Sequence, residues 1–180
     1  MVCDSTNVFE EGESGSEESV KQGLIDLIAE QKQAVAVTTF ASNVARVKSI
    51  VEAAELAGRA VCLVGRSMHR ITDAAKSVGI LPPHMEFVDE SEASQIPAEH
   101  ILYLCTGSQG ESRAALTRIS RRDHRNVSLH EGDTVIFSSR QIPGNEKGIF
   151  ALQNALAEQG VRVITPRMVP YPIHVSGHPC

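Results

Sequence analysis

The chain alternates short apolar runs with longer amphipathic segments, and this alternation limits the folds that it can adopt. Five runs rich in Val, Ile, Leu and Ala are bounded by polar turns, at residues 34–40, 60–64, 101–105, 134–137 and 161–164. Runs that are apolar throughout are typical of strands buried on both faces of a sheet. Strands that alternate with helices predict a mainly parallel sheet.

Helices are predicted between these runs, because apolar residues recur there at intervals of three and four. A Gly closes several of these segments, as is common just after a helix. The predicted helices cover residues 17–31, 44–57, 69–78, about 114–119 and 146–159. A weaker strand is predicted at 85–88, after Pro82-Pro83. The prediction is one α/β domain over residues 1–180: a three-layer, Rossmann-like fold with a mainly parallel sheet and helices on both faces.

Composition narrows the environment of the chain. There is no Trp and there are only seven Phe and Tyr residues, so the core must consist of aliphatic side chains. The net charge of −5 excludes a global basic field that would bind nucleic acid non-specifically. The four cysteines form no CxxC pair, which favours free thiols and a cytoplasmic protein. No apolar run reaches the ~18 residues that span a membrane, so no membrane association is expected.

Small hydroxyl residues and glycines follow each predicted strand. These stretches are Ser42-Asn43, Gly65-Arg66-Ser67, Thr106-Gly-Ser108-Gln-Gly110, Ser138-Ser-Arg140 and His174-Val-Ser176-Gly177-His178. In open α/β sheets, ligands bind at the carboxyl ends of the strands. Serine hydroxyls and Gly-rich turns suit an anion, above all a phosphate, and Arg46, Arg66 or Arg140 could add charge. Capping and turning alone would explain any single loop, and none is a Walker A or GxGxxG motif.

Three other features are open to two interpretations. His174 and His178 have the spacing of metal ligands on a helix, but the Ser-Gly between them favours a turn, and no complete metal site is predicted within the chain. Cys105 is more readily a buried thiol than a nucleophile. Residues 118–125 hold the one basic cluster of the sequence, which fits a solvated helix end or an RNA track.

Seven motifs occur together and in a fixed order: Asp4-Ser-Thr-Asn7, Thr39-Phe-Ala-Ser-Asn43, Gly65-Arg-Ser-Met68, Cys105-Thr-Gly-Ser-Gln-Gly-Glu111, Gly132-Asp-Thr-Val-Ile-Phe-Ser-Ser139, Ile142-Pro-Gly-Asn145 and His174-Val-Ser-Gly-His178. The series closely resembles the β-CASP domain of bacterial ribonuclease J, over essentially the whole chain. Two departures are Ser112-Arg113, where the family usually has Pro-Met, and Arg140 after the paired serines.

The resemblance implies roles for particular residues. Asp4 and His178 match the acid and the histidine that face the metal cleft, and are expected to be catalytic. Ser42, His174 and Ser176 match residues that hold the RNA phosphate. Four residues are added to this phosphate- and RNA-binding set. They are Arg46, from the predicted helix at 44–57, and Ser67, Ser108 and Gly177, from the polar loops.

The resemblance also implies a larger enzyme, in which the β-CASP domain is inserted into a metallo-β-lactamase domain. That enzyme is a 5′-to-3′ exonuclease and endonuclease that prefers RNA with a 5′-monophosphate end, and it is expected to assemble as a homo-oligomer. Two Zn²⁺ ions are bound by ligands outside this chain, so the chain alone is expected to bind no zinc and to be inactive. The alternative is a free-standing α/β domain that binds a nucleotide or a sugar phosphate.

Overall fold

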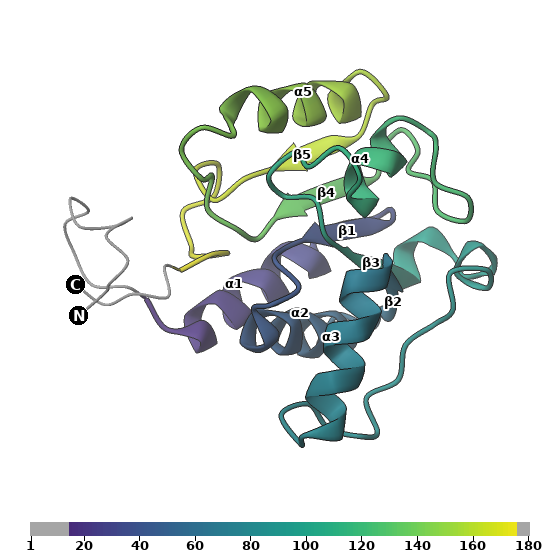
Figure 1. Ribbon diagram of the computed structural model, residues 1–180, viewed down its shortest axis with the longest axis vertical. Helices are drawn as coiled ribbons and strands as arrows, with labels where there is room; N and C mark the ends of the chain where they lie inside the picture. The colour runs from purple at the N-terminus through teal and green to yellow at the C-terminus, as the bar shows by residue number, and fades with distance from the viewer. Residues whose placement is uncertain (1–14, 176–180) are drawn as a thin grey trace.

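A computed structural model of the chain describes residues 15–175. Within this range, the strands form one parallel sheet in the order β2-β3-β1-β4-β5 (Figure 1). The strands are β1 (Val35–Thr38), β2 (Ala60–Val64), β3 (Ile101–Cys105), β4 (Thr134–Phe137) and β5 (Arg162–Ile164). The prediction of an α/β fold with a mainly parallel sheet is confirmed, and every pairing in this sheet is parallel.

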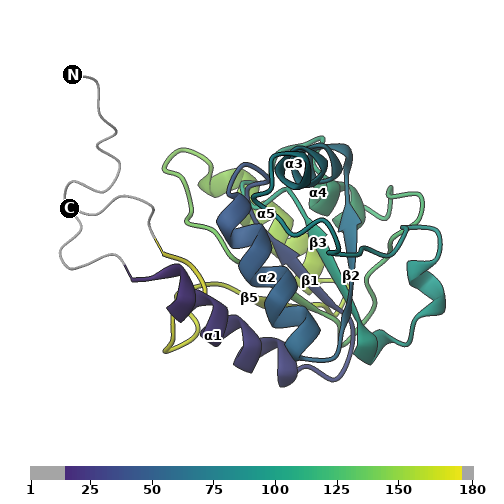
Figure 2. The same ribbon diagram turned by 90° about the horizontal axis from the view of Figure 1, so that it is seen from below.

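Helices cover both faces of the sheet. They are α1 (Glu17–Ala29), α2 (Val44–Leu56), α3 (Arg66–Ser77), α4 (Ala115–Ser120) and α5 (Glu146–Ala157), with short 3₁₀ turns at Ala93–Gln95 and Ala98–His100. Helices α1, α2 and α3 pack on one face, and α4 and α5 on the other (Figure 2). The three predicted layers are therefore present in the part of the chain that the structure describes.

Alternate residues of each strand point to opposite faces and give the sheet two cores. In β1, Val35 and Val37 contact the core under α1 and α2, whereas Ala36 contacts the core under α4 and α5. All four residues of β1 are buried, because this strand lies in the middle of the sheet between β3 and β4. An apolar run without polar alternation is what a strand covered on both faces requires.

The segment at 85–88 differs from its prediction. It contributes one isolated bridge, Val88 with Cys62, in place of a strand. The reason lies in the next residues, where Asp89 accepts hydrogen bonds from the backbone and hydroxyl of Ser91 and turns the chain. Helix α3 also begins earlier than predicted, at Arg66, because Gly65 adopts a φ of 99° and ends β2 directly at the helix.

No helix among residues 15–175 is long and apolar enough to cross a membrane.

Candidate phosphate-binding site

Because all the strands run in parallel, their carboxyl ends lie along one edge of the sheet, and the polar loops follow them there. The loops after β1 and β2 lead to α2 and α3 on one face. Those after β3 and β4 lead to α4 and α5 on the other. The loops after the neighbouring strands β1 and β4 thus lead to opposite faces of the sheet, and this arrangement opens a crevice at the sheet edge.

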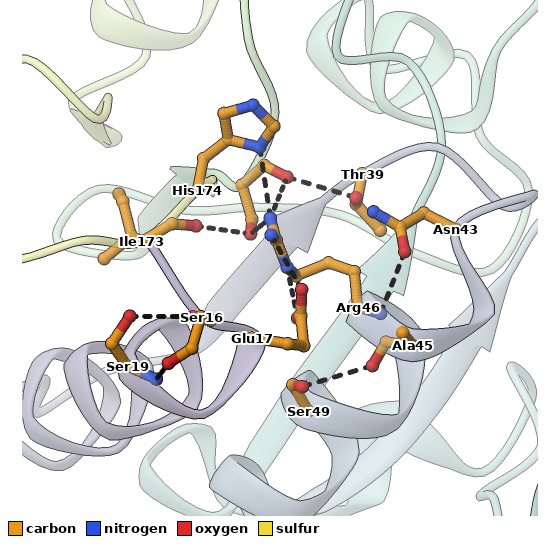
Figure 3. Close-up of polar contacts among 11 residues, drawn as sticks. Ser16, Glu17, Ser19, Thr39, Asn43, Ala45, Arg46, Ser49, Ile173 and His174 are labelled. Atoms are coloured by element: carbon orange, nitrogen blue, oxygen red, sulfur yellow. Dashed lines mark hydrogen bonds and ion pairs between the residues drawn. The ribbon is translucent and has the colours of Figure 1, made fainter. Parts of the chain in front are cut away.

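Arg46 is the centre of a polar network at this edge (Figure 3). It lies in the first turn of α2, where the side chain of Asn43 accepts from its backbone N–H at 3.1 Å. The guanidinium is 0% exposed. Its Nε and Nη2 donate to the two carboxylate oxygens of Glu17, at 2.6 and 3.1 Å. This two-pronged pairing fixes the plane of the guanidinium and balances its buried charge.

The remaining nitrogen of the guanidinium reaches the end of β4. Nη1 of Arg46 donates to the backbone oxygen of Ser138 at 3.1 Å and to its hydroxyl at 3.0 Å. The Ser138 hydroxyl in turn donates to the backbone oxygen of Ile173 at 2.6 Å. Thr39, just after β1, donates its hydroxyl to the backbone oxygen of Ser138 at 3.1 Å. The network therefore fixes residue 173, next to the histidine, against β1, β4 and α2.

His174 completes the network with its imidazole. Its Nδ1 lies 3.2 Å from Nη1 of Arg46. A guanidinium can only donate, so Nδ1 must accept, and the proton of a neutral imidazole then resides on Nε2. Burial, followed by the charge of Arg46, lowers the pKa of His174 from 6.5 to about 4. Near neutral pH, His174 is therefore a neutral ring in a fixed tautomer, with its Nε2–H available as a donor.

Glu17 is the anion of the network and comes from the first turn of α1. Burial would raise the pKa of Glu17, but the hydrogen bonds and the charge of Arg46 outweigh burial and hold the pKa below its ordinary value. Its carboxylate is therefore ionised when His174 is neutral. Pairing with Glu17 thus keeps the positive charge of Arg46 directly behind the imidazole without exposing that charge to solvent.

A pocket of about 610 Å³ opens beside His174, and its walls include Ser108, Ser139, Arg140 and Thr165. Ser108 is buried and accepts a hydrogen bond from Gln109 at 3.3 Å. The structure therefore brings His174 and Ser108 to one pocket, at the ends of β3, β4 and β5. Hydroxyls, a neutral N–H donor and Arg140 can hydrogen-bond an oxyanion of the size of a phosphate.

Gln109 fixes the wall of this pocket. Its amide donates to the backbone oxygen of Arg140 at 2.8 Å and accepts from the backbone N–H of Ile142 at 2.9 Å. The loop also needs Gly110, with φ of 74°, where an added Cβ would lie 2.4 Å from the backbone of Gly148. The loop after β3 and the start of α5 are thereby held together.

The structure places the remaining predicted residues apart from this pocket or does not describe them. Arg46 is buried behind His174 and does not line the pocket. Ser42 is exposed in the turn before α2, and Ser67 is exposed in α3, beside a second pocket. Asp4, Ser176, Gly177 and His178 lie outside the described residues.

Sequence reasoning missed the residues that hold His174 in place. Glu17 is only the first residue of the helix predicted at 17–31, and Ser138 is predicted only as part of a polar strand end. Their signal is visible in the sequence only after the fold is known, because Glu17 and Arg46 are 29 residues apart and Arg46 and His174 are 128 apart.

The described residues do not fit a metal centre. No group of three or more His, Cys, Asp or Glu side chains within residues 15–175 could hold a metal ion. Cys62 and Cys105 are buried free thiols, and burial, the largest cause for each, raises their pKa to about 12. They are protonated at neutral pH and are unsuited to act as metal ligands or nucleophiles.

Comparison with known proteins identifies the family. Residues 32–156 match a family described as "Ribonuclease J, beta-CASP domain". Ribonuclease J of Sinorhizobium meliloti is 49% identical over 99% of this chain and 31% of its own length. Ribonuclease J of Corynebacterium glutamicum is 41% identical over 99% of this chain and 25% of its own length. Ribonuclease J of Mycobacterium tuberculosis is 40% identical over 99% of this chain and 32% of its own length. The chain thus spans between a quarter and a third of these relatives.

Proposed function

The chain belongs to the ribonuclease J β-CASP family, and from this premise we propose that it is the RNA-binding β-CASP domain of a ribonuclease J-type enzyme. In this proposal, residues 1–180 form that domain within a longer protein. Its task is to bind RNA phosphates and to position the strand for hydrolysis.

The observation that carries the proposal is the state of His174. A neutral imidazole that presents Nε2–H, backed by the buried guanidinium of Arg46, is a preorganised donor for a phosphate oxygen. The donor is held by four hydrogen bonds of Arg46 and Ser138 rather than by its own backbone alone. A site of this kind loses little entropy when the anion binds, because its side chains are already in place.

The rest of the proposed site is assigned from the pocket lining and from positions in the sequence. Ser108 lines the same pocket, and Ser176 and Gly177 follow His174 directly in the sequence. We assign Ser42 to the same phosphate-binding set from its place after β1. Asp4 and His178 are assigned to the catalytic centre of the parent enzyme.

Hydrolysis belongs to the parent protein in this proposal. We propose a cytoplasmic, homo-oligomeric ribonuclease that acts as a 5′-to-3′ exonuclease and endonuclease and prefers a 5′-monophosphate end. Its two Zn²⁺ ions would be held by residues outside this chain and would supply the hydrolytic chemistry. The alternative, a free-standing domain for a nucleotide or sugar phosphate, has less support, since each of the three relatives described above is named Ribonuclease J.

The proposal is tested by titrating the ¹⁵N-labelled chain with a nucleoside 5′-monophosphate and, in parallel, with the nucleoside that lacks the phosphate. We expect amide shifts at residues 106–110 and 174 with the monophosphate and none with the nucleoside. His174→Asn is the matched variant: its amide oxygen can replace Nδ1 as the acceptor for Arg46, but it leaves no donor at Nε2. This variant should fold and lose the shifts. Equal shifts in the variant, or none in the wild type at millimolar ligand, would contradict the proposal.

A further inference from the structure

A second and larger pocket lies at the same edge of the sheet, on the side of β2 and β3. Its volume is about 940 Å³, and it opens between the starts of α3 and α4. The two starts are close together: a Cβ at Gly65 would lie 3.2 Å from the Cβ of Ala115. Pockets of 300–1,000 Å³ are of the size that holds nucleotide-like ligands.

The walls of this pocket are strongly basic. Five arginines line it, together with a single carboxylate, that of Glu90. The arginines are Arg66 and Arg70 from α3, Arg113 just before α4, Arg118 within α4, and Arg125 from the loop that follows. The whole chain carries a net charge of −5, so this concentration of positive charge runs against its overall sign. A basic pocket on an acidic protein attracts anions locally.

Most of this charge is not balanced within the described part of the chain. Arg66, Arg70, Arg113 and Arg125 make no ion pair or side-chain hydrogen bond there. Arg118 donates to the backbone oxygen of Asp123 at 3.1 Å and so holds the loop at the rim of the pocket. The one carboxylate that lines the pocket makes its hydrogen bond to a backbone N–H and not to an arginine.

Glu90 is that carboxylate, and it is bound at the pocket wall. Its Oε1 accepts the backbone N–H of Gly65 at 3.2 Å, and both His69 and His124 lie 4.0 Å from its carboxylate oxygens. Glu90 therefore provides an acceptor for a backbone N–H at the start of α3, where no side chain of the N-cap residue does so. Burial, the largest cause, lowers the pKa of His124, so this ring adds no positive charge to the pocket at neutral pH.

We propose that this arginine pocket binds backbone phosphates of the RNA strand whose terminal phosphate is held at His174. The ligand chemistry is phosphate, and the planar guanidinium groups suit its oxygens. Strand β2, which leads into the arginine pocket, lies three strand spacings of about 4.8 Å, or about 14 Å, from β4, which leads into the other pocket. A strand a few nucleotides long covers this distance. The inference rests on the proposed RNA-binding function for the source of the phosphate.

The first experiment asks which pocket binds phosphate. Pyrophosphate is titrated into the ¹⁵N-labelled chain, and amide shifts are read at residues 65–67 and 113–115 for the arginine pocket and at 108–110 and 174 for the other. Shifts at residues 65–67 and 113–115 support this inference, whether or not the second set moves. Shifts at 108–110 and 174 alone overturn it and leave the proposed function standing. Shifts at neither set contradict both.

The second experiment asks whether the phosphate comes from RNA or from a free nucleotide. Fluorescence anisotropy compares 5′-phosphorylated oligoribonucleotides of two and of eight nucleotides. In the double variant Arg70→Ala/Arg113→Ala, we expect three- to tenfold weaker binding of the eight-mer for each arginine removed. Each lost contact should also reduce the slope of log K against log salt by about 0.7. Binding of the dimer should not change.

Arg121→Ala is the matched control, because Arg121 is exposed in the same basic segment but does not line the pocket. It should bind the eight-mer like the wild type. Equal losses in the double variant and in the Arg121→Ala control would mean that charge, and not the pocket, attracts RNA, and would overturn the proposal. If the double variant loses dimer and eight-mer affinity equally, the pocket binds a free nucleotide, and the assignment to an extended strand is wrong.

Discussion

The arginine behind one pocket of the sheet edge and the arginines that line the other are in opposite states. Beside His174, the guanidinium of Arg46 is fully buried, paired with Glu17 and bonded to Ser138. Beside α3, Arg66 and Arg113 are exposed and make no ion pair to a described residue. Arg46 orients a neutral donor at the first pocket. Arg66 and Arg113 present their charge directly to the second.

The difference follows from what surrounds each arginine. A buried cation is tolerated only when a carboxylate and several acceptors balance it, and the result is a rigid arrangement that recognises geometry. An exposed cation keeps its rotamer freedom and recognises charge, with an affinity that falls as salt rises. One edge of the sheet can therefore hold an RNA end in a defined position and attract the following strand less specifically.

The largest expected effect is the loss of Arg46. Arg46→Ala leaves the Glu17 carboxylate without its partner and removes the bonds to Ser138 and His174, which should lower the free energy of unfolding by about 4 kcal/mol. Urea denaturation monitored by circular dichroism measures the change. Arg113→Ala, in the other pocket, is the matched control, and its effect should stay within about 0.5 kcal/mol. Equal losses in the two variants would remove the contrast between the pockets.

The second effect is the pH dependence of stability that His174 should add. The pKa of His174 is about 4 in the folded chain, against 6.5 for an ordinary histidine. Between these two pH values the unfolded chain binds a proton that the folded chain does not. The contribution of His174 to the free energy of unfolding is therefore fully present above pH 6.5. It is lost as the pH drops to about 4, by about 3 kcal/mol in all.

The measurement for this second effect is a series of urea unfolding curves from pH 7.5 to pH 4. His174→Asn keeps an acceptor for Arg46 but cannot titrate, so its stability should depend far less on pH within this window. Glu17 contributes separately: because its folded pKa is lowered, its stabilisation is lost only below its ordinary pKa of 4.5. Parallel curves for the wild type and His174→Asn above pH 4.5 would contradict the assigned state of His174.

The third effect concerns Ser138, which joins Arg46 to the backbone before His174. Ser138→Ala removes the donor to Ile173 and an acceptor for Arg46, and should cost about 1–2 kcal/mol. Ser139→Ala is the control for the stability measurement only, because the neighbouring hydroxyl makes no hydrogen bond within the described residues but lines the pocket. The Ser138 variant should also weaken nucleoside monophosphate binding, since His174 loses its support. Unchanged binding would mean that His174 is positioned without Ser138.

Much of the fold was predictable because the signals are local. The runs at 60–64, 101–105 and 134–137 became strands with those bounds, and the helical spacing placed the five main helices within a few residues of their positions. The segment at 85–88 was mispredicted as a strand because Asp89 accepts hydrogen bonds from Ser91 that turn the chain, while Glu90 bonds to Gly65. Such bonds override a weak propensity, and their partners are not evident from the pattern.

The candidate site was predictable only in outline. Placing polar loops at strand ends led to Ser108 and His174, which do share a pocket. Ser67 was assigned to the same group, yet the strand order puts β2 and β4 on opposite sides of β1 and β3, so it lies beside the other pocket. Arg46 was expected to contact phosphate, and the structure instead buries it behind His174. Whether it also acts on RNA stays a prediction.

The smallest expected effect is the stabilisation of the chain by pyrophosphate bound in the arginine pocket. In the His174→Asn background, phosphate binding at His174 is impaired, so any remaining effect of pyrophosphate comes from the arginine pocket. At twice its Kd, pyrophosphate should raise the free energy of unfolding by about 0.6 kcal/mol. Adding Arg113→Ala should reduce this gain, whereas adding Arg121→Ala should preserve it. Urea curves with and without pyrophosphate, at constant ionic strength, measure the difference. The same gain in both double variants would show that the exposed arginines of this pocket do not act as a phosphate site.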